Sequence, residues 1–378
     1  MVDFENMLSN EQQISNSTPH FAVNASRVGS KGGLHTFTIA LLSCLSIRYP
    51  NVEVVVPEGV PVPVKVRVVN IPSWLRNSSR ISKLRPLLWL LYSSLCFPVK
   101  STTKVISTTH HLIPFRRSQI PTVHDLRPFY EPDSWVQQFY FRHLLPRGLR
   151  KCDGIITVSQ TSKFELIRVY GVPAERVYVI PNAVSLPIER SLSRTYNAQD
   201  SAPYLLMVGA SLRHKNAIEL LERHALWEAE YKLKIIAGKG QYRGFLEHRT
   251  LMLGIGDRVE FIDEINEERL AEMYSTCSAL VYPSRMEGFG LPPLEAMSYG
   301  RPAIVSDIPV LRELLGDAAL FVKLGDEQSW ATAFRDLKEV TADHGHWRID
   351  AGRKLAASFS LERMETALMT ALREIWSI

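Results

Sequence analysis

Short apolar runs rich in β-branched residues recur along the chain, and polar or amphipathic stretches separate them. In the second half, runs of this kind predict strands at residues 204–208, 233–237, 259–262, 279–282, 302–306 and 319–322. Segments with helical periodicity lie between most of them, for example at residues 217–226. Strands that alternate with helices in this way predict a parallel, doubly wound α/β sheet with right-handed crossovers.

The first half contains the same kinds of segment at less regular intervals. Strands are predicted at residues 21–24, 52–56, 64–69, 105–107, 120–124, 154–158 and 177–180. Helices are predicted at residues 34–49, 83–96, 135–151, 160–170, 330–338 and 361–375. The polar stretch 185–202 is the expected linker, since a chain of 378 residues is long enough for two domains.

One stretch, Glu287-Gly-Phe-Gly-Leu-Pro-Pro-Leu-Glu295, combines a glycine loop with two carboxylates directly after a predicted strand. The prolines are expected in the first turn of a helix that runs from Leu294 to Tyr299 and stops at Gly300. A helix N-terminus offers free N–H groups to an anion, and carboxylates accept hydrogen bonds from hydroxyl groups. Because a nucleotide sugar carries both kinds of group, the stretch predicts a nucleotide-sugar site.

Glu287 and Glu295, with seven residues between them, resemble the paired glutamates of the family 4 retaining glycosyltransferases. The residues between them are similar to the family at nearly every position, and so is the segment Met297-Ser-Tyr-Gly-Arg-Pro-Ala-Ile-Val-Ser306. The resemblance covers nearly the whole chain and implies the GT-B fold. In that fold, two Rossmann-like doubly wound domains face each other across a cleft, and the C-terminal helix crosses back to the first domain. The expected boundaries are 1–190 for an acceptor-binding domain, 203–357 for the nucleotide-sugar domain and 358–378 for the last helix.

In the second domain the resemblance implies a donor site around Lys215, in the loop Gly209-Ala-Ser-Leu-Arg-His-Lys-Asn216. No acidic residue is adjacent to Lys215 in the sequence, and His214 stands where the family commonly has arginine. A lysine there can neutralise a diphosphate and stabilise the charge that develops as the diphosphate leaves. The expected donor-binding residues of this domain are Gly209, Arg213, Lys215, Ile262, Glu287, Gly288, Phe289, Gly290, Leu291 and Glu295.

In the first domain the resemblance implies three further site residues. Gly32 and Gly33 resemble the family's glycine loop near the donor diphosphate, with Lys31 beside them as a phosphate or acceptor contact. His124 resembles the histidine that contacts the donor sugar, so Glu287, His124 and Lys215 are the expected catalytic residues. The adjacent His110 and His111 are expected at a strand end, where neighbouring side chains point to opposite faces and form no chelate.

Two other ligand classes fit the sequence poorly. The segment Gly238-Lys-Gly-Gln-Tyr-Arg-Gly244 is one residue longer than the dinucleotide fingerprint and follows the second strand of its domain, which disfavours a NAD dehydrogenase. No Asp-x-Asp pair lies near a predicted strand end, so no metal site is predicted. The resemblance implies that the departing phosphate oxygen is the base for the acceptor hydroxyl, so catalysis rests on positioning and charge stabilisation.

The charge is unevenly distributed along the chain. Residues 1–190 contain 22 Lys and Arg against 12 Asp and Glu, whereas the remaining residues contain 22 against 27. A basic first half suggests an anionic partner, such as a membrane surface or a lipid acceptor. The apolar run 84–97 is too short to span a bilayer and predicts either a core helix or a membrane-facing one.

The cellular compartment follows from weaker signals. Four scattered cysteines and a polar N-terminal segment predict a cytoplasmic protein, peripheral at the inner face of the membrane.

Together these observations predict a metal-independent hexosyltransferase with no cofactor and no nucleic-acid partner. The resemblance is to bacterial exopolysaccharide and O-antigen mannosyltransferases. It implies GDP-mannose as donor and a glycan or a polyprenyl-diphosphate-linked oligosaccharide as acceptor. Two alternatives stay open: a GT-B nucleotide-sugar epimerase, which needs no acceptor, and a catalytically silent GT-B scaffold.

Overall fold

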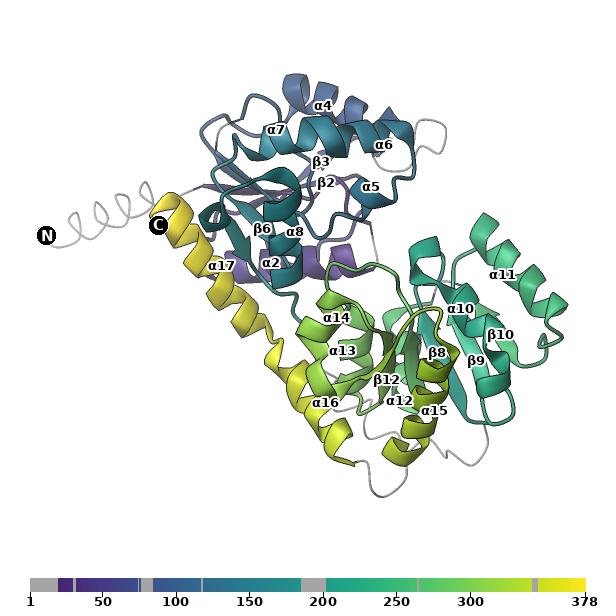
Figure 1. The fold of residues 1–378 in the computed structure, drawn as a ribbon. Coiled ribbons are helices and arrows are strands. Elements are labelled where there is room, and N and C mark those ends of the chain that lie inside the picture. Colours follow the sequence, from purple (N-terminus) through teal and green to yellow (C-terminus); the bar gives the residue numbers. More distant parts are fainter. Residues whose placement is uncertain are drawn as a thin grey trace, which may run out of the picture. The chain divides into compact units, whose positions relative to one another are not determined.

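The computed structural model describes residues 20–29, 32–73, 75, 84–116, 118–184, 202–263, 265–341 and 346–378. The chain forms two compact units (Figure 1). Unit 1 consists of Met1–Ala183 and Leu361–Ile378, and unit 2 of Val184–Ser360. The predicted linker lies almost entirely outside the described residues.

Unit 1 contains a parallel sheet whose strands follow the order β3-β2-β1-β4-β5. Its strands are β1 (Phe21–Asn24), β2 (Glu53–Pro57), β3 (Arg67–Ile71), β4 (Lys104–Ser107) and β5 (Gln119–Pro121). A parallel pair, β6 (Ile155–Thr157) and β7 (Val177–Val179), continues this layer through a bridge between Thr122 and Ile156. From β1 the chain first adds β2 and β3 on one side and then β4 and β5 on the other. This order makes the sheet doubly wound and Rossmann-like, as predicted.

Helices cover both faces of this sheet. They are α2 (Gly33–Arg48), α4 (Arg85–Cys96), α5 (Arg127–Tyr130), α6 (Trp135–Phe139), α7 (Leu145–Leu149), α8 (Gln160–Tyr170) and α17 (Leu361–Trp376). Figure 1 shows α4, α6 and α7 on one face, with α2 and α17 on the other. The helix α8 begins where predicted, because the Ser159 hydroxyl caps it by accepting a hydrogen bond from the amide of Ser162.

The helix predicted at residues 135–151 is present from Trp135 to Leu149, but it is not α-helical throughout. A π-helical turn, Tyr140–Leu144, separates α6 from α7. Pro146 has no N–H to donate to the preceding turn, so the regular hydrogen-bond ladder cannot run unchanged through this segment. Local periodicity predicted the position of the helix but not this interruption.

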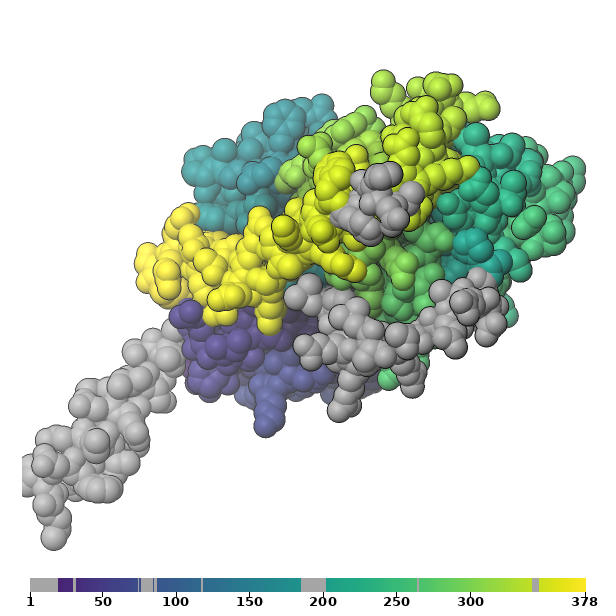
Figure 2. Space-filling view, turned by 90° about the horizontal axis from the view of Figure 1, so that it is seen from below, coloured from purple at the N-terminus to yellow at the C-terminus, as the bar shows by residue number. Residues whose placement is uncertain are grey.

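The C-terminal helix α17 belongs to unit 1, which confirms the prediction that it returns to the first domain. It packs against α2, where Arg48 forms an ion pair with Glu365 at 2.9 Å. At its far end the Trp376 ring lies 5.7 Å from the ring of Phe21 in β1. In Figure 2 the yellow end of the chain accordingly covers the purple residues of this unit.

The apolar helix α4 is neither wholly core nor wholly surface. Trp89 and Ser93 are buried, and the Trp89 indole donates to the carbonyl of Leu112 at 2.9 Å. Leu91 and Leu95, however, are 61% and 75% exposed. Across the described residues, no helix has both the length and the apolar content needed to cross a bilayer.

Unit 2 contains a six-stranded sheet, in which every pair is parallel and the order is β10-β9-β8-β11-β12-β13. Its strands are β8 (Tyr204–Val208), β9 (Lys232–Ile236), β10 (Val259–Ile262), β11 (Ala279–Tyr282), β12 (Ala303–Ser306) and β13 (Leu320–Val322). All six coincide within a residue of the predicted strands. Most of them are buried apolar runs in a sheet that is covered on both faces, whereas β10, at the edge of the sheet, is only partly buried.

The helices of unit 2 complete the second Rossmann-like layer arrangement. They are α10 (Ala217–Glu222), α11 (Gln241–Met252), α12 (Glu267–Thr276), α13 (Leu291–Ser298), α14 (Pro309–Leu315), α15 (Glu327–Thr341) and α16 (His346–Ser358). On one face α10, α11 and α15 enclose a core around Trp227 and Trp330. On the other, α13 packs against β11 and α12, and α16 packs against α13.

Candidate active site

Lys215 and Glu287 form a close ion pair in unit 2. The Lys215 Nζ lies 2.7 Å from Glu287 Oε1 and 2.5 Å from the hydroxyl oxygen of Tyr282. Lys215 follows β8, whereas Tyr282 ends β11 and Glu287 comes five residues later. Because β8 and β11 are parallel neighbours in the sheet, their carboxyl ends meet and bring these residues together.

No acidic residue is adjacent to Lys215 in the sequence, but Glu287 lies beside it in three dimensions. The two residues are 72 positions apart, and only the strand order makes them adjacent. Their side chains are 14% and 11% exposed. Burial opposes ionisation of Glu287, but the Lys215 ammonium outweighs it, so the pKa of Glu287 lies below its ordinary value. Burial raises the pKa of Tyr282 well above its ordinary value, and the Glu287 carboxylate raises it further, so this hydroxyl stays protonated.

The loop between β11 and α13 carries Glu287 and turns at Gly290, whose φ is positive. Gly290 has φ +121°, and a Cβ atom there would lie 2.7 Å from Leu311 Cδ2. Phe289 is buried, with its ring edge-to-face against Phe359 at 5.4 Å. The phenylalanine anchors the loop while the glycine permits its turn, and Gly288 lies between Phe289 and Glu287.

The helix α13 begins at Leu291, three residues earlier than predicted, and Gly290 is its N-cap. Pro292 and Pro293 then occupy the second and third helical positions. The first four N–H groups of a helix have no intrahelical acceptor, so prolines there remove no hydrogen bond. Gly300 follows the helix with φ +71°, as expected of a C-terminal glycine.

Glu295 consequently lies in the second turn of α13 and not at its start. The Tyr274 hydroxyl, from α12, donates to Glu295 Oε2 at 2.7 Å. Burial raises the pKa of Glu295 above its ordinary value, an effect that the Tyr274 hydrogen bond opposes. The two glutamates thus differ in their electrostatic surroundings, since Glu287 has a cation beside it and Glu295 has a neutral phenol.

The other predicted residues of this unit have less specific surroundings. Gly209 follows β8 with φ +78°, a conformation that favours glycine. Arg213 is exposed, with its guanidinium 5.7 Å from the Tyr242 ring centre, and Ile262 is the last residue of β10. The structure therefore brings Lys215 and Glu287 into direct contact but gives no contact between Arg213 and either of them.

Sequence reasoning did not single out Tyr274, Tyr282 or Asn216. The two tyrosines hold the side chains of Glu295 and Lys215, and the only local signal was the aromatic residue at the end of a predicted strand. Asn216 is fully buried in the left-handed conformation, with φ +59°, and its Nδ2 donates to Glu219 at 3.0 Å. Asparagine tolerates this conformation better than most residues do, which explains its place directly after Lys215.

In unit 1 the predicted residues gather at the carboxyl edge of the sheet. Gly32, with φ +93°, is the N-cap of α2, which begins at Gly33. One turn later the Phe37 ring packs edge-to-face on the His124 imidazole, with ring centres 4.8 Å apart. Lys31 lies outside the described residues.

His124 is held as a neutral imidazole. Burial lowers the pKa of His124, although its hydrogen bond to the Thr108 carbonyl, at 2.9 Å from Nε2, opposes the shift. A neutral ring that donates from Nε2 to a carbonyl has its acceptor lone pair at Nδ1. His124 can therefore accept a hydrogen bond from a hydroxyl group at Nδ1.

The expected placement of His110 and His111 at a strand end, with side chains on opposite faces, is wrong. They lie in the loop after β4 and not on a strand, and their rings stack with centres 4.4 Å apart. Strand alternation does not apply to a loop, so the two side chains share one side. Burial lowers the pKa of His110 to about 3, and His111 Nδ1 lies 2.9 Å from the Thr109 hydroxyl. Both rings are thus neutral, and His111 is buried whereas His110 is partly exposed.

Comparisons with known proteins agree with this architecture. Residues 31–186 match the family described as Glycosyltransferase Family 4, and residues 189–353 match the family described as Glycosyl transferases group 1. The O-antigen chain mannosyltransferase RfbU of Salmonella typhimurium is 38% identical over 327 residues, which is 84% of this chain and 91% of the relative. The O-antigen chain mannosyltransferase B of Escherichia coli is 30% identical over 276 residues, or 67% of this chain and 70% of the relative.

Among solved structures, sucrose-phosphate synthase from Thermosynechococcus elongatus superposes with a TM-score of 0.74 at 20% identity, covering 95% of this chain and 99% of that one. This likeness concerns the fold and supports the predicted GT-B architecture of two Rossmann-like units. The identity to RfbU over most of both chains, together with the two family matches, identifies the family as well as the fold. On this evidence the chain belongs to glycosyltransferase family 4.

Proposed function

We propose that this protein is a retaining mannosyltransferase that transfers mannose from GDP-mannose to a lipid-linked glycan during assembly of an O-antigen type of polysaccharide. The observation that carries the proposal is the buried Lys215–Glu287 pair, in a chain similar over most of its length to an O-antigen chain mannosyltransferase. An ion pair at the carboxyl ends of adjacent parallel strands lies where open α/β sheets bind their ligands.

The ion pair suits the departure of a nucleoside diphosphate. An ammonium group has three N–H donors, and Lys215 directs two of them to Glu287 and Tyr282. The third can donate to a diphosphate oxygen and stabilise the negative charge that grows as the sugar–phosphate bond breaks. At the start of α13 the N–H groups of Gly290 and Leu291 can serve the same anion, because the helix has no side-chain cap, whereas Pro292 and Pro293 have no N–H to donate.

The two glutamates fit separate parts of the donor. Glu287, ionised by its cation, can orient sugar hydroxyls and support the positive charge of an oxocarbenium-like transition state. Glu295 can accept hydrogen bonds from the ribose hydroxyls. His124 of unit 1, with its acceptor at Nδ1, can accept a hydrogen bond from a hydroxyl group.

Retention of configuration follows if the acceptor attacks from the face that the phosphate leaves. The bond between the anomeric carbon and the phosphate oxygen breaks, and the acceptor oxygen forms its bond to the same face. The acceptor's proton goes to the departing phosphate oxygen. This route needs neither a protein nucleophile nor a metal ion. Lys215 and the amides at the start of α13 then have to stabilise the negative charge of the departing diphosphate.

A lipid-linked acceptor would bring the enzyme to the inner face of the cytoplasmic membrane. The excess of Lys and Arg over Asp and Glu in residues 1–190 supports an anionic partner for unit 1. The exposed Leu91 and Leu95 of α4 add apolar surface to the same unit.

The proposal is tested with the purified full-length protein, polyprenyl-diphosphate-linked glycan acceptors and a panel of GDP-, UDP-, dTDP- and ADP-sugars. We expect transfer only from GDP-mannose, with an α-linkage by ¹H NMR because the donor is an α-anomer. A β-linked product would refute the retaining mechanism, and transfer from another donor alone would refute the sugar assignment. Donor conversion without any acceptor would indicate an epimerase or hydrolase instead.

A further inference from the structure

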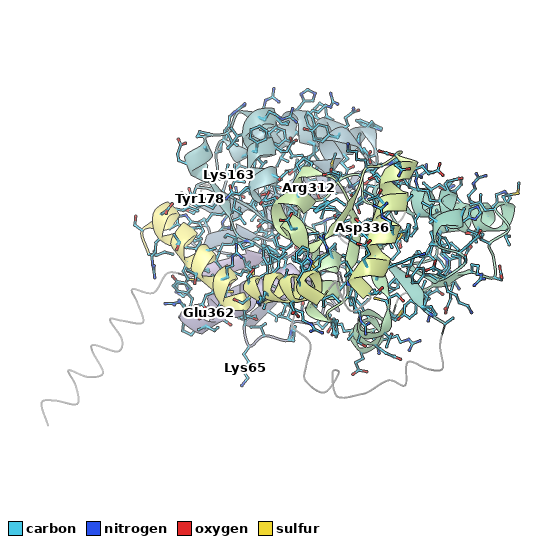
Figure 3. The ribbon with its side chains drawn as sticks, turned by 60° about the horizontal axis from the view of Figure 1, so that its bottom comes forward. Lys65, Lys163, Tyr178, Arg312, Asp336 and Glu362 are labelled. Atoms are coloured by element: carbon cyan, nitrogen blue, oxygen red, sulfur yellow. The ribbon has the colours of Figure 1, made fainter. Side chains whose placement is uncertain are left out.

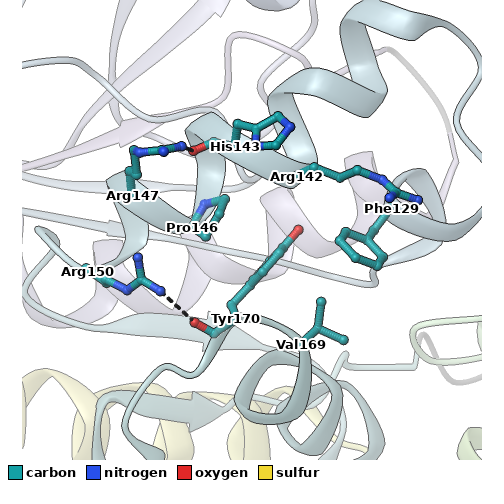
Figure 4. Close-up of a pocket in the computed structure, with 8 residues that line it drawn as sticks. All are labelled: Phe129, Arg142, His143, Pro146, Arg147, Arg150, Val169 and Tyr170. Atoms are coloured by element: carbon teal, nitrogen blue, oxygen red, sulfur yellow. Dashed lines mark hydrogen bonds between the residues drawn. The ribbon is translucent and has the colours of Figure 1, made fainter.

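A basic pocket of about 280 Å³ lies on unit 1, between the α6–α7 segment and α8 (Figure 4). Its lining residues are Phe129, Arg142, His143, Pro146, Arg147, Arg150, Val169 and Tyr170. Three of these eight are arginines, one is a histidine and none is acidic. These basic side chains are exposed and lie close together without an acidic residue among them, so the lining favours an anionic ligand.

The three arginines have no acidic partner within the described part of the chain. The Arg142 guanidinium lies 5.0 Å from the Phe129 ring centre, and Arg147 donates to the carbonyl of His143. Arg150 donates to the carbonyl of Tyr170 at 3.2 Å. Each guanidinium has five N–H donors, so donors remain for a ligand at every one of them.

Tyr170 provides a second and independent indication. The residue is 4% exposed, and its hydroxyl has no hydrogen-bond partner among the described residues. Figure 4 shows the phenol directed between Arg142 and Pro146, toward the middle of the lining residues. Burial raises its pKa, so the hydroxyl stays protonated and remains a donor without an acceptor. Buried donors are normally satisfied, and a bound oxyanion would satisfy this one.

The pocket is separate from the predicted site residues of unit 1. The helix α8 connects β6 to the parallel strand β7, so its last residue, Tyr170, lies toward the amino-terminal edge of the sheet. His124 follows β5 at the opposite, carboxyl edge. A ligand in the pocket would therefore bind in addition to the donor.

We propose that this arginine pocket is a binding site for a phosphate ester, a chemistry that an anionic lipid headgroup and a soluble phosphate compound share. Arginine presents planar, forked donors that match phosphate oxygens in pairs. The aromatic and apolar members of the lining suit a phosphate that carries an organic group. The proposal concerns unit 1 alone and does not depend on which sugar the enzyme transfers.

The surroundings favour the lipid source. Trp135 and Phe139 on α6 are 70% and 47% exposed, next to the segment that carries the arginines. The helix α4, with its exposed Leu91 and Leu95, lies on the same face of the sheet (Figure 1). Exposed aromatic and leucine side chains around a basic site are typical of surfaces that contact a membrane interface.

The test measures binding of the full-length protein to two probes. One is a vesicle of phosphatidylglycerol in phosphatidylcholine, and the other is soluble glycerol 3-phosphate. The informative variants are Arg142→Lys with Arg147→Lys, which keep the charge but lose the forked donors, and Tyr170→Phe, which removes only the hydroxyl. The control is Lys65→Gln, because Figure 3 shows Lys65 extending from the surface on the side opposite Lys163 of α8, and Lys65 does not line the pocket.

We expect the double Arg→Lys variant to bind phosphatidylglycerol vesicles about tenfold more weakly, and Lys65→Gln to bind within about twofold of the wild type. Tyr170→Phe should weaken binding by about threefold, with no loss of thermal stability, because the hydroxyl has no internal hydrogen bond to lose. Arginine-dependent binding of glycerol 3-phosphate without vesicle binding would support the site and assign it to a soluble ligand.

Two outcomes would overturn the proposal. In the first, Lys65→Gln weakens vesicle binding as much as the double arginine variant does, which would mean diffuse charge attraction. In the second, neither probe binds in a way that depends on the arginines. Nucleoside diphosphate binding by the same variants, measured by calorimetry, should stay unchanged, so failure here is distinguishable from failure of the proposed function.

Discussion

The ion pair between Lys215 and Glu287 makes a prediction that separates its structural role from its catalytic one. The perturbation is a double-mutant cycle with Lys215→Met, Glu287→Gln and the combination of both. Each single variant leaves one charge without its partner in a site where the side chains are only 14% and 11% exposed. The double variant removes both charges and keeps similar side-chain volumes.

The expected magnitudes follow from the geometry. At 2.7 Å the gross attraction at an effective dielectric constant of 20 is about 6 kcal/mol, before the cost of removing both charges from water. Breaking a buried pair from one side costs about 3–5 kcal/mol in the free energy of unfolding. Because both side chains keep some solvent access, we expect about 3 kcal/mol for each single variant. The double variant should be more stable than the sum of the two predicts, with a coupling energy of about 2 kcal/mol.

The assay is urea unfolding of all four proteins, followed by far-UV circular dichroism, alongside donor turnover. Turnover should fall by two to three orders of magnitude in Lys215→Met, the usual loss for one charge-stabilising donor. It should not recover in the double variant, although that variant loses less stability than the sum of the two single losses. Stability losses that add within about 0.5 kcal/mol would refute the coupling. Near-normal turnover of Lys215→Met at saturating donor would remove Lys215 from the diphosphate site.

The same pair predicts a dependence on pH. The pKa of folded Glu287 lies below the ordinary value of 4.5, so the carboxylate stabilises the folded state above that pH and loses this contribution as the pH falls through its folded pKa. The difference in melting temperature between wild type and Glu287→Gln should therefore be largest near neutral pH and shrink in acid. A gap that stays constant down to acid unfolding would contradict this sign.

Further predictions concern the glycine loop, the second glutamate and metal ions. Gly290→Ala should lower the free energy of unfolding by about 1–3 kcal/mol, since it introduces a Cβ 2.7 Å from Leu311 Cδ2 at φ +121°. The control is Gly244→Ala within α11, where nothing lies within 4 Å, and it should be neutral or stabilising. Equal changes in melting temperature in the two variants would count against backbone strain at position 290. Glu295→Gln should raise the donor KM with little change in kcat, because ribose contacts are equal in ground and transition states, and it should raise the melting temperature at neutral pH by relieving a buried carboxylate. Glu287→Gln should lower kcat while calorimetry shows nearly unchanged affinity for the bare nucleoside diphosphate; equal weakening by both glutamate variants would mean that their roles are misassigned. Activity is expected to survive EDTA, and a loss that Mg²⁺ or Mn²⁺ restores would refute metal independence.

Much of the fold follows from local patterns. The six strands of unit 2 were predicted within a residue, since most of them are buried apolar runs whatever their neighbours are. The start of α8 was predicted from its capping serine, Ser159. The end of α13 was predicted from Gly300, which has the positive φ that such a position favours. The motif from Glu287 to Glu295 likewise predicted a ligand loop, because its glycines, prolines and carboxylates act over a few residues.

What the sequence could not determine depends on contacts between distant segments. Lys215 meets Glu287 because β8 and β11 are neighbours in a sheet whose order is not the order of the chain, and Tyr282 joins them for the same reason. Packing of the surrounding segments also determines the π-helical turn before Pro146 and the stacking of His110 on His111. Strand or helix periodicity in the sequence carries no information on such packing. A sequence determines which residues are buried through local periodicity, whereas only the tertiary structure decides which buried charges meet, because strand order and helix packing set those distances.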